Sequence, residues 1–177
     1  MVKVQRFSDV RPCEVREMKF NMISEVKKNG KTVWIYIIPR KQATKRSDHP
    51  RLVFLDGICR KILKKYKKIR KPDEYVFRSQ KEKDTCYTKD TYKQAIERAC
   101  IAAGIEVWNP GQIRHRGTTE IAKKFGDKVA AACAGHTNTK TTNRYYIEQM
   151  EMAIDACFKM DRARVRRKKK KIQSVNQ

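Results

Sequence analysis

Three residues with reactive or charged side chains are spaced along the second half of the chain. Arg114 comes first, His136 follows a glycine, and Tyr145 stands nine residues after His136. An arginine suits a phosphate because its planar guanidinium stays charged and can grip two oxygens at once. A histidine can donate a hydrogen bond to the same group, and a tyrosine hydroxyl can attack it as a nucleophile. The segment is therefore a candidate site for chemistry on a phosphate.

This segment resembles the second conserved box of the tyrosine recombinases, the phage-integrase family. The resemblance rests on the arginine, on Gly135-His136 and on the tyrosine nine residues later. A second match lies near the start of the chain, where Arg11-Pro12-Cys13-Glu14 resembles the family's Arg-Pro-x-Glu core. Residues 91–115 are also similar to integrase catalytic domains. The resemblance extends from Arg11 to about residue 160.

The resemblance implies a role for each matched residue. Tyr145 would attack the phosphorus and form a 3′-phosphotyrosine link, which conserves the bond energy for rejoining. Arg11 and Arg114 would clamp the phosphate, Glu14 would orient Arg11, and His136 would donate to a phosphate oxygen. No metal, ATP or other cofactor is implied.

Two positions depart from the family pattern. Gly111 stands where the family's HxxR motif has a histidine that helps to accept the tyrosine proton. General-base help is typically worth about 10²–10⁴ in rate, so we expect slower cleavage. The family's catalytic lysine aligns with Ala43, and Lys45 is the preferred substitute, with Lys41 as the alternative. His115 is adjacent to Arg114, but neighbours on a helix point about 100° apart.

Each of these residues also has an ordinary structural interpretation. Arg11 and Arg114 could be surface arginines, His136 an incidental turn residue, and Lys45 a solvated loop charge. A tyrosine on a helix is more often a packing residue than a nucleophile. The spacing from His136 selects Tyr145 over its neighbour Tyr146.

The composition indicates a polyanionic partner. The 177 residues include 43 Lys and Arg against 19 Asp and Glu, a net charge of +24, which favours binding to nucleic acid. An anionic membrane surface is the rival partner, but no apolar run approaches the roughly 20 residues of a spanning helix. The first residues also lack the apolar stretch of a signal peptide. We therefore expect a soluble, intracellular protein, cytoplasmic and associated with the nucleoid.

The six cysteines show no CxxC pair and no nearby histidine at zinc-like spacing, so we expect them to be reduced and to bind no metal.

The fold class expected from the hydropathy pattern and the resemblance is α+β, a mainly helical domain with a small antiparallel sheet. Strands are predicted at residues 32–39 and 51–55, with a basic loop between them and a hairpin turn at Asn29-Gly30. Apolar periodicity predicts helices at 11–20, 57–69, 88–103, 110–125 and 129–134. A short helix at 140–146 would present Tyr145, and Ile147, Met150, Ile154 and Phe158 would form one stripe on a final helix.

A single catalytic-type domain followed by a basic tail is expected. Residues 1–160 form the integrase-like catalytic domain, and 161–177 form a flexible basic tail with too little apolar content to pack. The amino-terminal core-binding domain of full-length family members is expected to be absent.

Three functions compete for this sequence. The first is a recombinase or integrase of a mobile element that acts as a homo-oligomer on double-stranded DNA. The second is a truncated or decayed integrase that binds DNA without cleaving it, which Gly111 and the displaced lysine favour. The third is an RNA-associated basic protein, which would make the four-residue match a coincidence.

Overall fold

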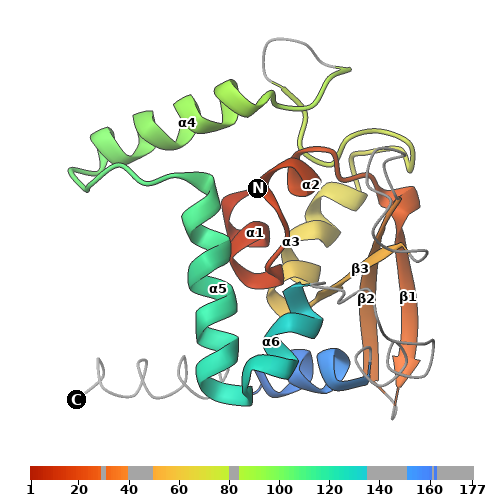
Figure 1. Ribbon diagram of the computed structural model, residues 1–177. Helices are drawn as coiled ribbons and strands as arrows, with labels where there is room; N and C mark the ends of the chain where they lie inside the picture. Colours follow the sequence, from red (N-terminus) through yellow and green to blue (C-terminus); the bar gives the residue numbers. More distant parts are fainter. Residues whose placement is uncertain (29–30, 40–49, 80–83, 135–150, 161, 163–177) are drawn as a thin grey trace, which may run out of the picture.

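The computed structural model describes residues 1–28, 31–39, 50–79, 84–134, 151–160 and 162. Figure 1 shows helices grouped around a small sheet, with α4 projecting at one end and α5 running alongside α1. The elements in chain order are α1 (Val2–Ser8), α2 (Pro12–Arg16), the 3-10 helix η1 (Phe20–Met22), β1 (Ile23–Lys28), β2 (Lys31–Ile38), β3 (Arg51–Leu55), α3 (Gly57–Lys67), α4 (Lys89–Ala102), α5 (Pro110–Phe125) and α6 (Asp127–Ala134). Residues 151–160 are also helical.

The sheet is antiparallel, with β2 between β1 and β3. In the pairing with β3, Trp34 lies opposite Leu55, and Tyr36 lies opposite Val53. Successive residues of β2 alternate between the two faces of the sheet, as strand geometry requires. Val33, Trp34, Ile35 and Tyr36 are all buried, so both faces of the sheet are covered.

The larger core lies on the face of Trp34 and Tyr36. It is formed with residues of α1 to α4, including Val4, Val15 and Leu63, all of which are fully buried. The smaller core lies on the opposite face, where Val33, Ile35 and Phe54 pack against Ala153 and Ile154. The helical residues 151–160 therefore complete the second layer against the sheet.

Local sequence sets where the long helices begin and end. The Asp56 carboxylate accepts a hydrogen bond from the Cys59 amide at 2.8 Å and caps α3. Thr88 caps α4 through the Thr91 amide at 3.1 Å. At α5, Asn109 caps the helix and Pro110 occupies its first turn, where a missing amide proton costs nothing. The chain leaves α5 at Gly126, whose φ of 84° favours glycine.

A buried glutamine joins three helices. Gln5 on α1 donates to the Pro110 carbonyl at 2.8 Å and accepts from the Tyr92 hydroxyl of α4 at 2.6 Å. Because all three groups lie in the interior, leaving any of them unpaired would cost free energy. This contact fixes α1 against the start of α5, where Arg114 is located.

The predicted fold class is confirmed, since the domain is mainly helical with a small three-stranded antiparallel sheet. The strands at 32–39 and 51–55 and the helices that begin near 57, 88 and 110 are present with ends shifted by a few residues. The helix predicted at 11–20 is shorter, because α2 ends at Arg16 and is followed by η1. Three elements were not predicted, α1, η1 and β1.

Several predictions fall on residues outside the described ranges. These are the turn at Asn29-Gly30, the helix at 140–146, and Ile147 and Met150 of the final stripe. Of that stripe, Ile154 is buried and Phe158 is half-buried within the helical residues 151–160. In the described part of the chain, no helix is long and apolar enough to cross a membrane.

Candidate active site

Arg11 stands immediately before α2, in an extended conformation that starts the helix at Pro12. Its amide donates to Glu14 Oε2 at 2.7 Å, and its guanidinium Nη1 donates to Glu14 Oε1 at 2.8 Å. The Arg11 side chain keeps 42% of its surface exposed. The helix start therefore holds Arg11 in place while leaving part of its side chain exposed.

Glu14 is the centre of the charged network. Its carboxylate is buried and also accepts from Arg51 Nη1, with both oxygens at 3.1 Å. The Tyr36 hydroxyl donates to the Glu14 carbonyl at 2.9 Å, which ties α2 to the sheet. The predicted support of Arg11 by Glu14 is thus present as a contact.

Arg51, the first residue of β3, is a third arginine at this site. Its side chain is 11% exposed, and Nη2 lies 3.5 Å from the Asp9 carbonyl oxygen. Burial lowers the pKa of Arg51 to about 10, and the nearby Glu14 carboxylate opposes that shift. Arg51 therefore remains charged at neutral pH.

Arg114 lies in the first part of α5 and points back toward α1. Nη1 donates to the Asp9 carbonyl at 2.9 Å, and Nη2 donates to the Ala134 carbonyl at the end of α6 at 2.7 Å. Burial lowers the pKa of Arg114, and the Asp9 carboxylate opposes that shift. Two backbone carbonyls from separate helices thus fix the direction of this guanidinium.

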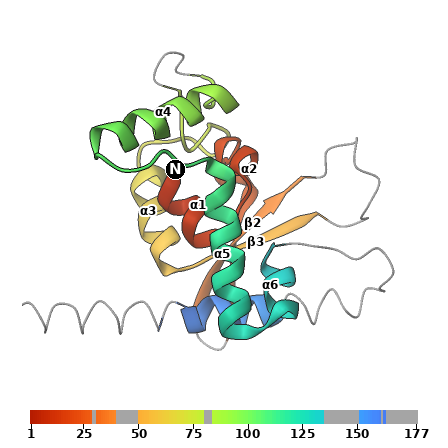
Figure 2. The same ribbon diagram turned by 60° about the vertical axis from the view of Figure 1, so that its left-hand side comes forward.

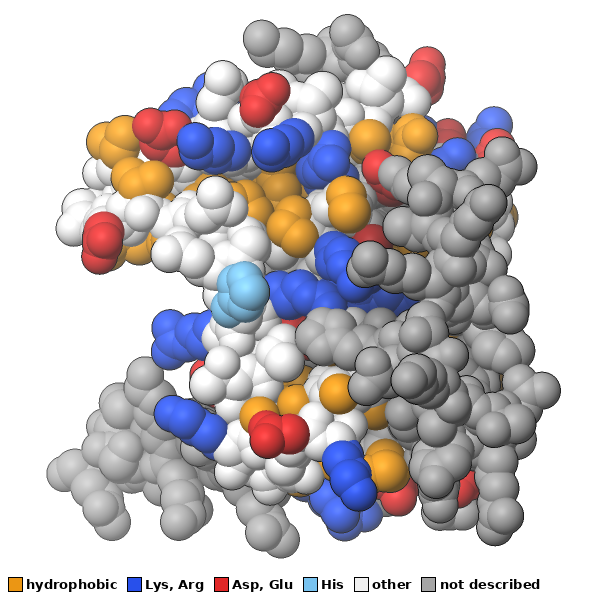
Figure 3. Space-filling view, viewed as in Figure 1, with side chains coloured by type: hydrophobic (Ala, Val, Ile, Leu, Met, Phe, Trp, Pro, Cys, Tyr) orange, Lys and Arg blue, Asp and Glu red, His pale blue; other side chains and the backbone are white. Residues whose placement is uncertain are grey.

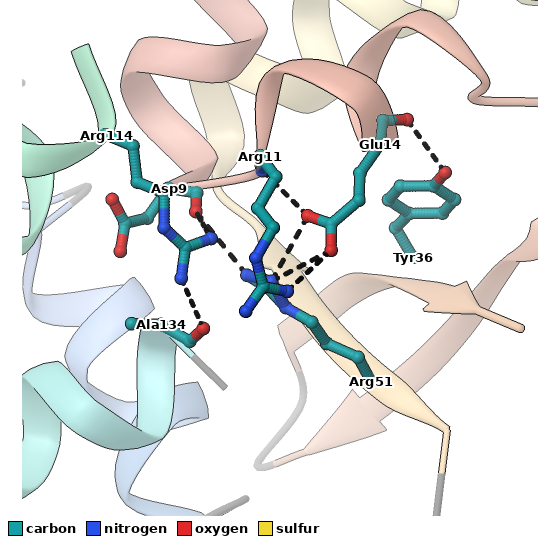
Figure 4. A network of polar contacts seen from close by, with 7 residues as sticks. All are labelled: Asp9, Arg11, Glu14, Tyr36, Arg51, Arg114 and Ala134. Atoms are coloured by element: carbon teal, nitrogen blue, oxygen red, sulfur yellow. Dashed lines mark hydrogen bonds and ion pairs between the residues drawn. The ribbon is translucent and has the colours of Figure 1, made fainter. Parts of the chain in front are cut away.

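The three guanidinium groups converge on one side of the domain. Figure 4 shows Arg11, Arg51 and Arg114 pointing toward one another, with Glu14 on one side and Asp9 on the other. Figure 3 shows Lys and Arg side chains gathered near the centre of the same face. The two carboxylates, of Asp9 and Glu14, cannot balance the charges of the three arginines, so this group of residues retains positive charge. Such an arrangement can bind the non-bridging oxygens of a phosphate.

Asp9 supports the cluster through its backbone. It ends α1 with a φ of 56°, a conformation that Asp and Asn tolerate better than most residues. Its carboxylate is buried and accepts from Thr118 Oγ1 at 2.9 Å, and burial raises its pKa. Gly117 makes this approach possible, because a Cβ there would lie 2.8 Å from Asp9 Oδ1.

Arg6 adds a second link between α1 and α5. Its Nη2 pairs with Glu120 Oε1 at 2.6 Å, about one turn of α5 beyond Gly117. Together with the contacts of Asp9, this pair holds α1 beside α5 along the side that carries Arg114.

Gly111 occupies α5 one turn before Arg114. Its amide donates to Asn109 Oδ1 at 3.0 Å, and among the described residues a Cβ at this position would come within 4 Å of that oxygen alone, at 3.6 Å. The backbone at residue 111 therefore has room for a Cβ. The described structure does not require a glycine at this position. His115 is exposed on α5.

Two buried tyrosines in the described part of the chain serve structural roles. Tyr36 and Tyr92 are buried, and each donates its hydroxyl to a protein oxygen. Burial raises the pKa of both hydroxyls. Neither is therefore available as a nucleophile.

The structure brings together two of the predicted site residues, Arg11 and Arg114. Tyr145, His136, Lys45 and Lys41 lie outside the described residues. Asp9 and Arg51 were not predicted as site residues. The positive charge of Arg51 was visible in the sequence, but its position beside Glu14 follows from the pairing of β3 with β2.

A cavity of about 40 Å³ lies behind Asp9, among α1, β3, α5, α6 and residues 151–160. Its lining is mostly apolar, with Asp9 and Asp56 as its acidic members. All six cysteines are free, and no group of residues in the described ranges could hold a metal ion.

Comparison with known proteins places this geometry in context. A family model described as "Phage integrase family" matches residues 1–152. A crystal structure of XerA recombinase is similar with a TM-score of 0.53 and 19% sequence identity, over 85% of this chain. The match covers 55% of the XerA chain, so this chain spans about half of that protein's length. A comparison with curated protein sequences found no significant match.

Proposed function

Because this chain belongs to the phage integrase family, we propose that it performs site-specific DNA recombination or integration, cutting and rejoining strands through a 3′-phosphotyrosine intermediate. The observation that carries the proposal is the convergence of Arg11 and Arg114 from separate parts of the chain. Their shared scaffold of Glu14, Arg51 and the Asp9 carbonyl holds the pair in a phosphate-binding arrangement.

In the proposed reaction, the Tyr145 hydroxyl gives its proton to solvent water as its oxygen bonds to phosphorus and the bond from phosphorus to the 5′-oxygen breaks. Arg11 and Arg114 neutralise the charge that builds on the non-bridging oxygens, and His136 donates to one of them. Lys45, or Lys41, gives a proton to the departing 5′-oxygen. A 5′-hydroxyl from another strand then attacks the phosphotyrosine and gives its proton back to the lysine, while the departing Tyr145 oxygen regains a proton from water. This step reseals the DNA and frees Tyr145.

Gly111 shapes the expected rate. A tyrosine with a pKa near 10 is mostly protonated at neutral pH, and no imidazole stands at residue 111 to accept its proton. We expect cleavage to be slow, because general-base help is worth about 10²–10⁴ in rate.

The test is covalent trapping on a pool of nicked duplexes that release the cleaved end and so prevent resealing. The wild type should form a protein–DNA adduct that survives denaturation, with the DNA on Tyr145 by peptide mass. Tyr145→Phe should form none. Tyr146→Phe is the matched control, because it removes the adjacent hydroxyl, and it should retain the adduct. A Gly111→His variant should form more adduct than the wild type.

The second candidate is an integrase remnant that binds DNA without cleaving it, and Gly111 is the observation that favours it. This reading predicts duplex binding with no adduct in any of the variants. An adduct that persists in Tyr145→Phe would contradict both candidates.

The proposed partner is double-stranded DNA, bound by a homo-oligomer. Two paired sites must be held together for strands to exchange, so more than one catalytic chain is required. The basic residues 161–177 are proposed to add phosphate contacts without reading base sequence.

A further inference from the structure

Helix α3 carries a separate concentration of positive charge. Residues 57–72, which include α3 and the segment after it, contain eight Lys and Arg and no Asp or Glu. By contrast, α4 contains Asp90 and Glu97, and α5 contains Glu120. The excess of basic residues is therefore unevenly distributed, and α3 holds a large share of it.

The lysines of α3 form one stripe opposite its packed side. Cys59 and Leu63 are buried in the larger core, with Ile62 and Tyr66 packed against it. At 100° per residue, Lys61, Lys64, Lys65 and Lys68 fall on the opposite side of the helix. All four are exposed. We call these four residues the α3 lysine stripe.

Two basic residues on the flanks of α3 have partners within the protein. Arg60 Nη1 donates to the Thr32 carbonyl at 2.5 Å. Lys67 lies 3.8 Å from Glu25 and over the Trp34 ring. None of the four stripe lysines is paired with an acidic residue in the described part of the chain.

The spacing of the stripe is unfavourable for an isolated helix. Lys61 and Lys65, and again Lys64 and Lys68, are like charges four residues apart, which repel on a helix surface. A bound polyanion removes that repulsion. Lysine is a compact, hydrated charge that suits contact with a phosphate backbone and carries no base specificity.

The stripe lies away from the arginine cluster. Figure 2 shows α1 between α3 and α5, and α1 contacts both helices. Arg114 reaches the cluster from the α5 side, whereas the stripe is on the side of α3 that faces away from the core. The stripe and the arginine cluster therefore lie on different sides of α1.

We propose that the α3 lysine stripe binds the phosphate backbone of a second DNA segment, distinct from the one held at the arginine cluster. The proposal adds a binding surface and does not depend on strand cleavage. A protein with both surfaces can hold two duplexes at once, so it would bring distant DNA segments together before any chemistry.

The test is capture of a second duplex. A duplex fixed on beads is loaded with protein, washed and offered a fluorescent duplex in solution. All variants carry Tyr145→Phe, so no result depends on cleavage. The stripe variant changes the four lysines to Gln. Its matched control removes the same charge elsewhere, by changing the exposed Lys3, Lys123, Lys128 and Lys159 to Gln.

The stripe variant should capture about tenfold less fluorescent duplex than the control, with affinity for the first duplex within about threefold of the parent protein. A milder variant, Lys64→Gln with Lys68→Gln, should reduce the salt slope of capture by about two. If the stripe and control variants lose the same amount of duplex capture, the loss reflects net charge and the proposal is overturned. Undiminished capture by the stripe variant would also overturn the proposal. The partner of the stripe would then be sought among acidic proteins.

Discussion

At the scale of single residues, the three arginines of the cluster are held in position by oxygen atoms of the protein itself. Glu14 is shared by Arg11 and Arg51, and the Asp9 carbonyl is shared by Arg51 and Arg114. Each guanidinium is therefore positioned by an oxygen that also positions its neighbour. Removing one partner of such a buried pair typically costs about 3–5 kcal/mol, because the remaining charge stays buried.

Asp9 makes a pH-dependent contribution to stability. Burial raises its pKa in the folded state, so the folded protein binds more protons than the unfolded chain between the ordinary and the raised value. The free energy of unfolding should therefore fall as the pH rises through that window. Asp9→Asn removes the titration and tolerates the positive φ. Urea unfolding from about pH 3 to about pH 7 should show the wild type losing stability relative to the variant.

The control for this measurement is Asp90→Asn, which changes an exposed carboxylate in the first turn of α4. Because Asp90→Asn keeps the buried Asp9 carboxylate, its free energy of unfolding should still fall as the pH rises through the Asp9 window. If the curves for the wild type and Asp9→Asn run parallel over the whole range, the buried carboxylate does not titrate as described.

At the scale of secondary-structure elements, the site depends on how closely α1 lies against α5. Gly117 faces the Asp9 carboxylate, and the ion pair of Arg6 with Glu120 flanks that contact. Arg114 is one turn before Gly117 on the same helix. The distance between α1 and α5 therefore determines whether Arg114 can donate its hydrogen bond to the Asp9 carbonyl.

Gly117→Ala should destabilise the protein by about 1–3 kcal/mol, because the new methyl group overlaps Asp9 Oδ1. Gly111→Ala is the control on the same helix, where the added carbon has room. It should be neutral or stabilise by up to about 1 kcal/mol through helix propensity. Denaturant unfolding measures both. Adding Asp9→Gly should relieve much of the Gly117→Ala cost, and strictly additive effects would contradict the proposed contact.

The sequence predicted those helices and strands whose own residues show a clear apolar or β-branched pattern. Strand β2 has a run of β-branched and aromatic residues, and α4 has a clear apolar stripe, so both were found. Helix α1 is short, and β1 is an edge strand with mostly exposed residues, so neither has strong periodicity. Arg11 and Arg114 were found through local motifs. Asp9 and Arg51 join the site only through tertiary contacts, which no local pattern reports.

At the scale of the whole molecule, the net charge of +24 dominates. The basic residues include the arginine cluster, the α3 lysine stripe and the sequence at 161–177. The arginine cluster is held by the buried Glu14 carboxylate, whereas no stripe lysine pairs with an acidic residue in the described ranges. Affinity and selectivity should therefore come from different parts of the chain.

DNA affinity should fall steeply with salt, because each phosphate contact releases counterions. Six to ten contacts would lose roughly 10³–10⁵-fold in affinity between about 50 and about 200 mM salt. Truncation after Met160 should weaken binding to all duplex sequences alike, since a basic arm contacts phosphates. Fluorescence titration of both proteins over a salt series measures these effects. A flat salt response would contradict DNA binding through a basic surface, and stronger binding to structured RNA would favour an RNA partner.

The smaller core has a consequence for how the protein is made. Val33, Ile35 and Phe54 lie far earlier in the sequence than Ala153 and Ile154, which cover them. During translation, the larger core can begin to form while this second apolar face of the sheet is still uncovered. The nascent chain therefore carries an exposed sheet face until residues 151–160 have left the ribosome. Their release then buries that face.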